Sequence, residues 1–283
     1  MEFRCRDAVL PLDRVAVMGV LNVTPDSFSD GGQWIDPTVA VEHALAMIDQ
    51  GAAIIDVGGE STRPNAVPVA TKEELARVLP VIEGLASQGR CLISIDTRKR
   101  EVAEAALAAG ASIVNDTLGE ESDGSLDEIA ARSGAALVVM HSRGTPATMR
   151  SLVHYDDVVA EVTAFLGRRA GELEKAGVSR DSIALDPGFG FAKTPEQNIA
   201  LLRELDRIVA LGYPVLVGTS RKSFIGALLG LPVDQRVEAT VATMCWAVTK
   251  GARIVRVHDV TPTLRAVRMT EAIVAGSSAG SSA

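Results

Sequence analysis

Short apolar segments alternate with amphipathic segments along most of the chain, and this alternation predicts the fold. The apolar segments are rich in Val, Ile and Leu, as is typical of parallel strands that are buried on both faces. Between them, apolar positions recur with the spacing of a helix. The expected strands are residues 15–21, 54–57, 92–95, 113–114, 137–140, 183–185, 215–217 and 254–257. The expected helices are residues 39–49, 72–87, 99–108, 126–133, 157–176, 195–211, 237–250 and 263–274.

Eight strands that alternate with eight helices, without a linker between them, predict a single parallel (β/α)8 TIM barrel of the α/β class. A doubly wound open sheet is the alternative, but no Gly-x-Gly-x-x-Gly pattern follows the first strand. We expect the barrel to span residues 1–275. Residues 276–283 contain only Gly, Ser and Ala, and we expect them to form a flexible tail.

Three connections are longer than is usual in barrels. They follow the first, second and fifth strands, over residues 22–36, 58–71 and 141–156. The first is rich in Ser, Asp and Gly and also contains Phe28, an apolar residue with no evident reason to lie in solvent. All three leave the carboxyl ends of strands, which is the face where barrel enzymes place their chemistry.

Composition narrows the class of protein. The 283 residues carry a formal net charge of −8, and Lys and Arg form no stripe, so neither nucleic acid nor an anionic membrane is an expected partner. The cysteines Cys5, Cys91 and Cys245 are scattered, which indicates neither a disulfide framework nor a zinc site. No apolar signal core or membrane-spanning run is evident, so we expect a cytoplasmic protein.

Polar side chains close most of the expected strands, and in a barrel these strand ends converge on one mouth. They are Asn22, Asp56, Asp96, Asn115, His141, Asp186, Arg256 and His258, with Lys222 shortly after the seventh strand. A single Asp or Asn after a strand commonly caps a helix or makes a turn. The recurrence at strand after strand favours a binding site.

The charges of these residues predict two subsites. Asp56, Asp96, Asn115 and Asp186 make a pocket rich in acceptors, which requires donors or a cation because unpaired buried charge is costly. A nitrogen-rich heterocycle with N–H groups along one edge would satisfy them. A transition metal is less suited because no His stands at ligand spacing.

The cations are expected away from the acids, in a separate anion subsite. The turn 218–223 after the seventh strand is rich in Gly, Ser and Thr and holds Arg221 and Lys222, which suits a phosphate. Arg256 and His258 alternate on one strand and so point to the same face. Thr62 and Arg63 can add a further donor and a positive charge.

In segment 186–191, Gly188 and Gly190 alternate with Phe189 and Phe191, which lets backbone approach a flat ligand beside an aromatic ring. By contrast, His43 and His154 fall on a helix and at a helix approach, and we interpret both as structural or surface residues.

Taken in order, eight segments resemble the dihydropteroate synthase family, the pterin-binding barrels of folate biosynthesis. They are residues 22–32, 56–64, 94–97, 115–116, 140–141, 186–191, 220–224 and 256–259. The resemblance covers residues 15–275. It implies an enzyme that condenses 6-hydroxymethyl-7,8-dihydropterin diphosphate with p-aminobenzoate, giving dihydropteroate and diphosphate, with Mg²⁺ as cofactor and sulfonamides as competitors of p-aminobenzoate.

The resemblance also implies roles for individual residues. Catalysis would involve Asp30 on a closing loop, Arg63 and Lys222. The pterin would be held by Asp56, Asp96, Asn115, Met140, Asp186 and Lys222. The diphosphate would meet Asn22 through Mg²⁺, and also Thr62, Arg63, Arg256 and His258. The p-aminobenzoate side would be shaped by Phe28, Thr62, Arg63, Pro64, Phe189, Lys222 and Ser223.

The chain departs from the family pattern at residues 142–146, at Asn65 and at residues 237–240. We expect these departures to affect the loops and the response to inhibitors, and to leave the pterin residues unchanged. Two other functions remain open: a methyltransferase that binds a reduced folate in the same pocket, and a catalytically silent paralogue.

A homodimer is expected from the family. The helix 237–248, with Met244, Cys245 and Trp246, is apolar enough to provide a contact face or simply to pack on the barrel.

Overall fold

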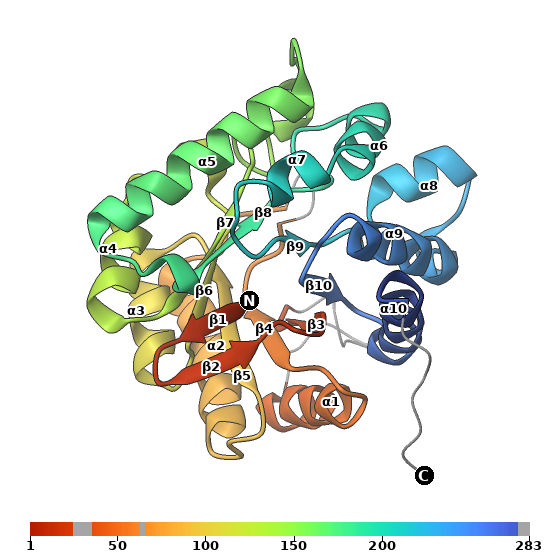
Figure 1. The fold of residues 1–283 in the computed structure, drawn as a ribbon. Coiled ribbons are helices and arrows are strands. Elements are labelled where there is room, and N and C mark those ends of the chain that lie inside the picture. Colours follow the sequence, from red (N-terminus) through yellow and green to blue (C-terminus); the bar gives the residue numbers. More distant parts are fainter. Residues whose placement is uncertain (25–35, 63–65, 277–283) are drawn as a thin grey trace.

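The computed structural model describes residues 1–24, 36–62 and 66–276, and it shows a parallel β-barrel surrounded by helices (Figure 1). Eight strands form one sheet in the order β8-β7-β6-β5-β4-β3-β10-β9. A parallel bridge between Leu185 of β8 and Val215, the residue before β9, closes the ring. The strands are β3 (Ala16–Asn22), β4 (Ile54–Gly58), β5 (Leu92–Thr97), β6 (Ile113–Asp116), β7 (Ala136–Met140), β8 (Ile183–Asp186), β9 (Leu216–Val217) and β10 (Ile254–Val257). The predicted barrel is therefore confirmed.

Helices connect the strands as the pattern predicts, with two differences. The expected helix 195–211 is divided, because the backbone leaves the helical region at Glu204 (φ −109°, ψ 26°). A short helix, α8, also precedes the expected helix after β9. The helices are α1 (Pro37–Asp49), α2 (Thr71–Ala86), α3 (Arg100–Ala108), α4 (Ser125–Ser133), α5 (Val158–Ala176), α6 (Pro195–Arg203), α7 (Asp206–Val209), α8 (Ser223–Leu229), α9 (Val237–Thr249) and α10 (Val260–Val274).

The long connections lie where they were expected. β3 ends at Asn22 and α1 begins at Pro37; β4 ends at Gly58 and α2 begins at Thr71. Between β7 and α5 the chain runs from 141 to 157 and includes a short 3₁₀ turn. The expected C-terminal tail lies almost wholly outside the described residues. Within the described ranges, no helix is long and apolar enough to cross a bilayer.

A β-hairpin at the amino terminus was missed from the sequence. β1 (Glu2–Cys5) pairs antiparallel with β2 (Ala8–Pro11), and the hairpin lies across one end of the barrel (Figure 1). Phe3 and Leu12 are fully buried and pack, with Cys5, on residues at the amino ends of the barrel strands. Four-residue strands give too little periodicity to be recognised in the sequence. The hairpin closes the floor of the barrel.

Side chains inside the barrel are sorted into two levels. Near the floor the inward residues are apolar and form one cluster: Ala16, Met18, Ile54, Ile113, Val138, Ala184, Leu216 and Ile254. Two residues further along a strand the side chain returns to the same face. There the inward residues include Asp56, Asn115, Asp186 and Arg256, which make the upper level polar. The residues between these inward positions, such as Ile55, Val114, Leu185 and Val255, face the helices in a separate core.

The floor provides the first testable prediction. Replacing Phe3 by Ala removes a fully buried ring and leaves a cavity beneath the barrel. We expect the free energy of unfolding, measured by urea denaturation, to fall by about 3–5 kcal/mol. Val9→Ala on the same hairpin is the control, because Val9 is 42% exposed and should change stability by about 0.5 kcal/mol or less. Equal losses for the two variants would refute the role given to the floor.

Candidate active site

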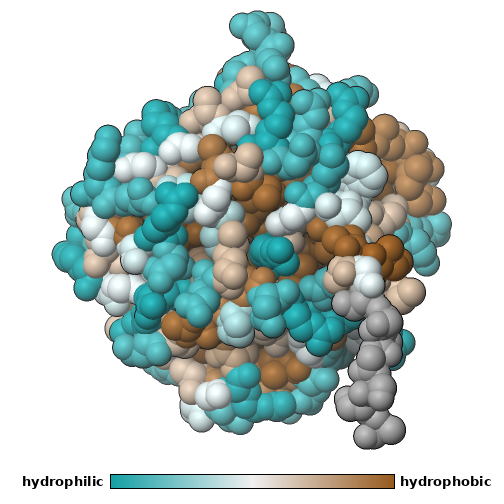
Figure 2. Space-filling view, viewed as in Figure 1, coloured by the Kyte–Doolittle hydropathy of each residue, from teal (hydrophilic) through white to brown (hydrophobic). Residues whose placement is uncertain are grey.

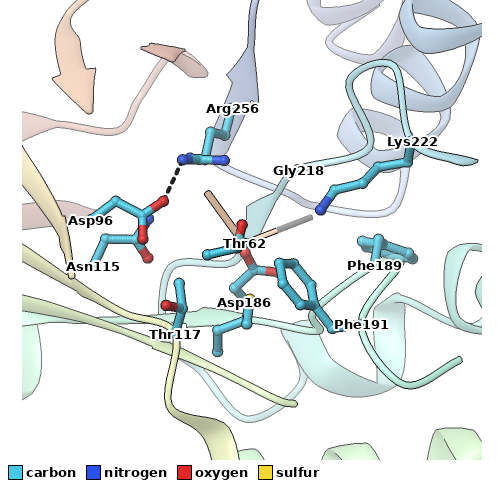
Figure 3. Close-up of a pocket in the computed structure, with 11 residues that line it drawn as sticks. Thr62, Asp96, Asn115, Thr117, Asp186, Phe189, Phe191, Gly218, Lys222 and Arg256 are labelled. Carbon is cyan, nitrogen blue, oxygen red and sulfur yellow. Dashed lines mark hydrogen bonds and ion pairs between the residues drawn. The ribbon is translucent and has the colours of Figure 1, made fainter. Parts of the chain in front are cut away.

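One cleft opens at the carboxyl ends of the barrel strands, and Figure 3 shows the side chains that line it. Its volume is about 320 Å³, including open solvent at the mouth. The lining residues come from β5, β6, β7, β8 and β10 and from the loops after β4, β6, β8 and β9. They are Thr62, Asp96, Asn115, Thr117, Met140, Asp186, Phe189, Phe191, Gly218, Lys222 and Arg256. Most of these were predicted from the sequence. Thr117 was not predicted. Phe191 and Gly218 belong to segments that were expected to contribute, 186–191 and 218–223, but they were not assigned individually to a subsite.

The buried acids are joined by one guanidinium. Arg256 donates from Nε to Asp56 Oδ2 at 2.6 Å and from Nη2 to Asp96 Oδ2 at 2.7 Å. Asn115 Nδ2 also donates to Asp56 Oδ2, at 3.0 Å. The expectation that the cations lie apart from the acids is therefore wrong for Arg256. Asp56 has no exposed surface and Asp96 only 9%, and such carboxylates need a buried counter-charge.

Acceptor capacity remains unused in this network. Asp56 Oδ1 and Asn115 Oδ1 are buried and have no hydrogen-bond partner among the described residues. Burial raises the pKa of Asp96 to about 7, and the neighbouring Arg256 guanidinium opposes this rise. Asp186 is also buried; burial raises the pKa of its carboxyl, and the backbone N–H of Gly188 counteracts this by donating to Oδ1 at 2.7 Å. The cleft thus offers buried oxygens to a ligand that carries N–H donors.

Lys222 faces the same cleft from the other side. It lies at the start of α8, and its Nζ is 4.0 Å from the centre of the Phe191 ring. Burial and the nearby Arg256 lower the pKa of Lys222 to about 8. Its backbone is fixed by Arg236, whose Nη1 donates to the carbonyl oxygens of Arg221 at 3.1 Å and Lys222 at 3.4 Å. In Figure 3 the ammonium points into the cleft toward Asp186.

The expected anion subsite is assembled in part. Ser220 Oγ lies 2.9 Å from His258 Nδ1 and also accepts the backbone N–H of His258 at 3.2 Å. Ser220 can therefore donate its hydroxyl proton to Nδ1, which leaves Nε2–H of a neutral imidazole as a donor. Burial lowers the pKa of His258 to about 3. Arg221 instead pairs with Asp259, Nη2 to Oδ1 at 2.6 Å, and so is not a spare anion ligand.

His141 does not join the cleft, which corrects its assignment to the polar mouth. Met140 points inward, so the next residue along the strand points outward to the helices. The His141 side chain is buried, its ring lies 5.0 Å edge-on from that of Phe165, and Nδ1 lies 2.9 Å from Lys193 Nζ. Burial, assisted by Lys193, lowers the pKa of His141 to about 2.

The other predicted residues fall into three groups. Asn22 is half-buried and lies beside Gly58. A Cβ added to Gly58 would be 3.8 Å from Asn22 Oδ1, and Asp96 lies on the other side of that glycine. Ser223 is exposed at the first turn of α8, and His43 and His154 are exposed as expected. Four predicted residues lie outside the described residues: Phe28, Asp30, Arg63 and Pro64.

Among residues 1–24, 36–62 and 66–276, Asn22 would offer a magnesium ion one ligand rather than a cage. Among the described residues, no three His, Cys, Asp or Glu side chains are gathered as a metal site. Mg²⁺ keeps several waters and commonly binds through one or two protein oxygens together with substrate phosphates. The single amide oxygen of Asn22 fits that mode, and it does not fit a metal held by the protein alone.

A cleft in which buried acids lie beside Lys222 and Arg256, at the mouth of a (β/α)8 TIM barrel, indicates a barrel enzyme for a nitrogen heterocycle with an anionic group. The profile of the family described as "Pterin binding enzyme" matches residues 18–258. The dihydropteroate synthase of Synechocystis sp. is 47% identical over 261 residues, which cover 92% of this chain and 90% of that protein. The chain therefore belongs to the dihydropteroate synthases, within the pterin-binding enzyme family.

Solved structures agree over nearly the full length. The Yersinia pestis dihydropteroate synthase with a sulfonamide drug complex has a TM-score of 0.91 at 41% identity, covering 97% of this chain and all of that chain. The Xanthomonas albilineans enzyme in complex with 7,8-dihydropteroate has a TM-score of 0.87 at 43% identity, covering 96% of this chain and 98% of that one. The fold thus agrees with that of solved dihydropteroate synthases.

The buried imidazole predicts how stability depends on pH. The unfolded chain protonates His141 below a pKa of about 6.5, whereas the folded protein keeps it neutral down to about 2. Its stabilising contribution is therefore complete above about pH 6.5 and is lost progressively as the pH falls toward 2. His141→Asn keeps an acceptor but does not titrate. The free energy of unfolding is measured by urea denaturation between pH 6 and pH 4 (a range chosen around this transition). In this variant it should fall less steeply with falling pH than in wild type, by about 1.4 kcal/mol per pH unit.

The matched control is His154→Asn, because the His154 side chain is 95% exposed and should leave the slope unchanged. A slope for His141→Asn that equals the wild-type slope would show that His141 is not kept neutral by the fold.

Proposed function

We propose that this chain condenses 6-hydroxymethyl-7,8-dihydropterin diphosphate with p-aminobenzoate, giving 7,8-dihydropteroate and diphosphate. The observation that carries the proposal is one cleft in which buried acceptors, Asp96 and Asp186, face the cations Lys222 and Arg256. The X. albilineans relative, which binds the product 7,8-dihydropteroate, supports this choice.

The acceptors suit the pterin ring. Its amino group and ring N–H groups are the donors that Asp56 Oδ1 and Asn115 Oδ1 lack. Asp96 and Asp186 can accept further hydrogen bonds, and Met140 supplies an apolar contact for the ring face. Lys222 adds a donor from the other side of the cleft.

The reaction requires that the charge on the departing diphosphate is stabilised and that the aromatic amine is positioned to attack. It requires no nucleophile from the protein. As diphosphate departs from the methylene carbon, negative charge develops on its oxygens, and the Arg256 guanidinium and His258 Nε2–H can stabilise it. Thr62 and Arg63 are proposed to assist there. The aromatic amine then attacks the methylene carbon, and its nitrogen releases one proton to solvent. Asp30 is our candidate for stabilising the electron-deficient pterin, and Arg63 and Lys222 complete the proposed catalytic set.

The p-aminobenzoate is proposed to bind at the outer part of the cleft. Phe189 and Thr62 line the cleft, and Lys222 and Ser223 lie at the start of α8. Phe28, Arg63 and Pro64 are proposed to contribute from the loops after β3 and β4. We also propose Mg²⁺ as cofactor, held by Asn22 together with the diphosphate; when bound, it would neutralise charge on the leaving group.

The two rival functions use the cleft differently. A methyltransferase for reduced folates would need the acceptors but not the anion donors around His258. A silent paralogue would bind the pterin without turnover. The location in the cytoplasm remains a prediction.

Diphosphate release in the presence of both substrates tests the function. We expect release to require p-aminobenzoate and to be stimulated by Mg²⁺. Asp186→Asn should weaken binding of the pterin diphosphate, measured by calorimetry with and without Mg²⁺, about 10- to 100-fold, because a hydrogen bond to a charged group is lost. Asp206→Asn is the matched control, since Asp206 is exposed and pairs with Lys250 on the outer helices.

Each rival predicts a different result. Pterin binding that ignores Mg²⁺, with no diphosphate released and no response to p-aminobenzoate, would favour the methyltransferase or the silent paralogue. Unchanged affinity in Asp186→Asn would remove Asp186 from the pterin site.

We further propose that the chain forms a homodimer through α8, α9 and α10. Figure 2 shows hydrophobic surface gathered over α8 and near the end of α10. Leu229 is 57%, Trp246 46% and Met269 62% exposed. Met244, which the sequence offered for this face, is fully buried and belongs to the barrel packing instead.

Analytical ultracentrifugation tests the dimer. Wild type is expected to sediment as a dimer, and Met269→Glu is expected to shift it toward monomer because a charge in an apolar interface is costly. Val39→Glu on α1, where Val39 is 46% exposed, is the control and should remain dimeric. A monomeric wild type would dismiss the proposal.

A further inference from the structure

Lys193 lies behind the cleft, and its ammonium is enclosed by backbone. The residue is 8% exposed. Its Nζ lies 3.0 Å from Gly188 O, 3.0 Å from Phe191 O and 3.3 Å from His141 O. A fourth acceptor, His141 Nδ1, is 2.9 Å away. Lys193 does not line the cleft and forms no ion pair with the carboxylates of the described residues.

These acceptors come from two neighbouring barrel strands. His141 follows β7, whereas Gly188 and Phe191 belong to the turn 188–191 after β8, hereafter the Gly188–Phe191 turn. Three carbonyl oxygens that converge on one point repel one another unless a cation lies between them. Burying an ammonium without such partners would in turn be costly. The cation and the converging carbonyls therefore stabilise each other.

The close approach of the two segments depends on glycine. Gly188 has φ +69°, and a Cβ there would lie 1.8 Å from His141 O. The Gly188 N–H meanwhile donates to Asp186 Oδ1 at 2.7 Å. The position of Asp186 in the cleft is thus tied to the turn that Lys193 holds.

The other side of the turn supports Lys222. The Phe191 ring lies under its ammonium at 4.0 Å. At Gly190, where φ is +80°, a Cβ would lie 3.0 Å from Lys222 Cδ, so the lysine stem runs close over the backbone. One turn therefore contacts two lysines, Lys193 through its carbonyl oxygens and Lys222 through an aromatic face.

We propose that Lys193 is a positioning residue: its ammonium fills the ring of carbonyls formed by His141, Gly188 and Phe191, and so fixes the turn that places Asp186 and Lys222. The consequence for turnover rests on the proposed function. The placement of Lys222 does not, and it can be measured separately.

NMR of the protein labelled with ¹³C,¹⁵N-lysine measures that placement without substrate. Wild type should show one ammonium strongly protected from exchange with solvent, because Lys193 is enclosed. Lys193→Met should remove that signal and shift the signals of Lys222. Lys250→Met is the control, since Lys250 pairs with Asp206 on the outer helices, and it should leave the Lys222 signals in place.

Kinetics test the path through Phe191. Lys193→Met should lower kcat/KM about 10- to 100-fold, as small displacements of reacting groups do. In a Phe191→Leu background the same substitution should cost much less, because the contact that transmits its effect is already gone. A purely structural role would make the two losses additive.

Chemical rescue provides a second variant, which also serves if Lys193→Met does not fold. Lys193→Ala leaves space for propylammonium, which matches the atoms removed. Added propylammonium should restore kcat/KM and the Lys222 signals in part, whereas 1-propanol should not. Unmoved Lys222 signals, additive losses or equal rescue by the alcohol would overturn the proposal. If wild type released no diphosphate while the Lys222 signals still moved, the proposed function would fail and the positioning role would stand.

Discussion

Carboxylates inside a barrel must be compensated before any ligand arrives, and the arrangement of this site follows from that requirement. Asp56 and Asp96 lie where solvent hardly reaches, and Arg256 connects them by two short hydrogen bonds. Removing one partner of a buried ion pair typically costs about 3–5 kcal/mol. Arg256 therefore belongs to the resting architecture as well as to the proposed chemistry. A substrate that carries both N–H donors and an anionic group would offer replacement partners to this network: its donors to the carboxylates, and its anion to the Arg256 guanidinium.

The same requirement explains how two lysines differ, Lys222 in the cleft and Lys193 behind it. Lys222 is held by its stem and by an aromatic face, so its ammonium remains available in the cleft. Lys193 uses its protons on backbone carbonyls and is unavailable. Burial lowers the pKa of Lys193 to about 7 and that of Lys222 to about 8, and a similar shift thus accompanies two different tasks. Geometry, rather than the pKa, distinguishes the group that can act on a substrate from the group that holds its neighbours.

Much of the fold was predictable because its strands are buried on both faces and its helices are amphipathic. Asp96, Asn115 and Asp186 could be found because each polar residue interrupts an apolar run. The contact of Arg256 with Asp56 could not, since it joins residues 200 positions apart and depends on which strands become neighbours. His141 was misplaced because a strand end read from the sequence does not reveal which face the last residue takes. Lys193 gave no signal, because a lysine after a turn is ordinarily exposed until tertiary carbonyls surround it.

The amino-terminal hairpin has a consequence for how the protein is made. Its partners are synthesised much later: Arg4 pairs with Asp181, 177 positions further along the chain. At translation rates of about 5–20 residues per second, this interval lasts roughly 10 to 35 s. During that time Phe3 and Leu12 have no complete barrel to pack against. The hairpin is thus synthesised before the strands that bury it, and its apolar side chains stay uncovered until the last of those strands is complete.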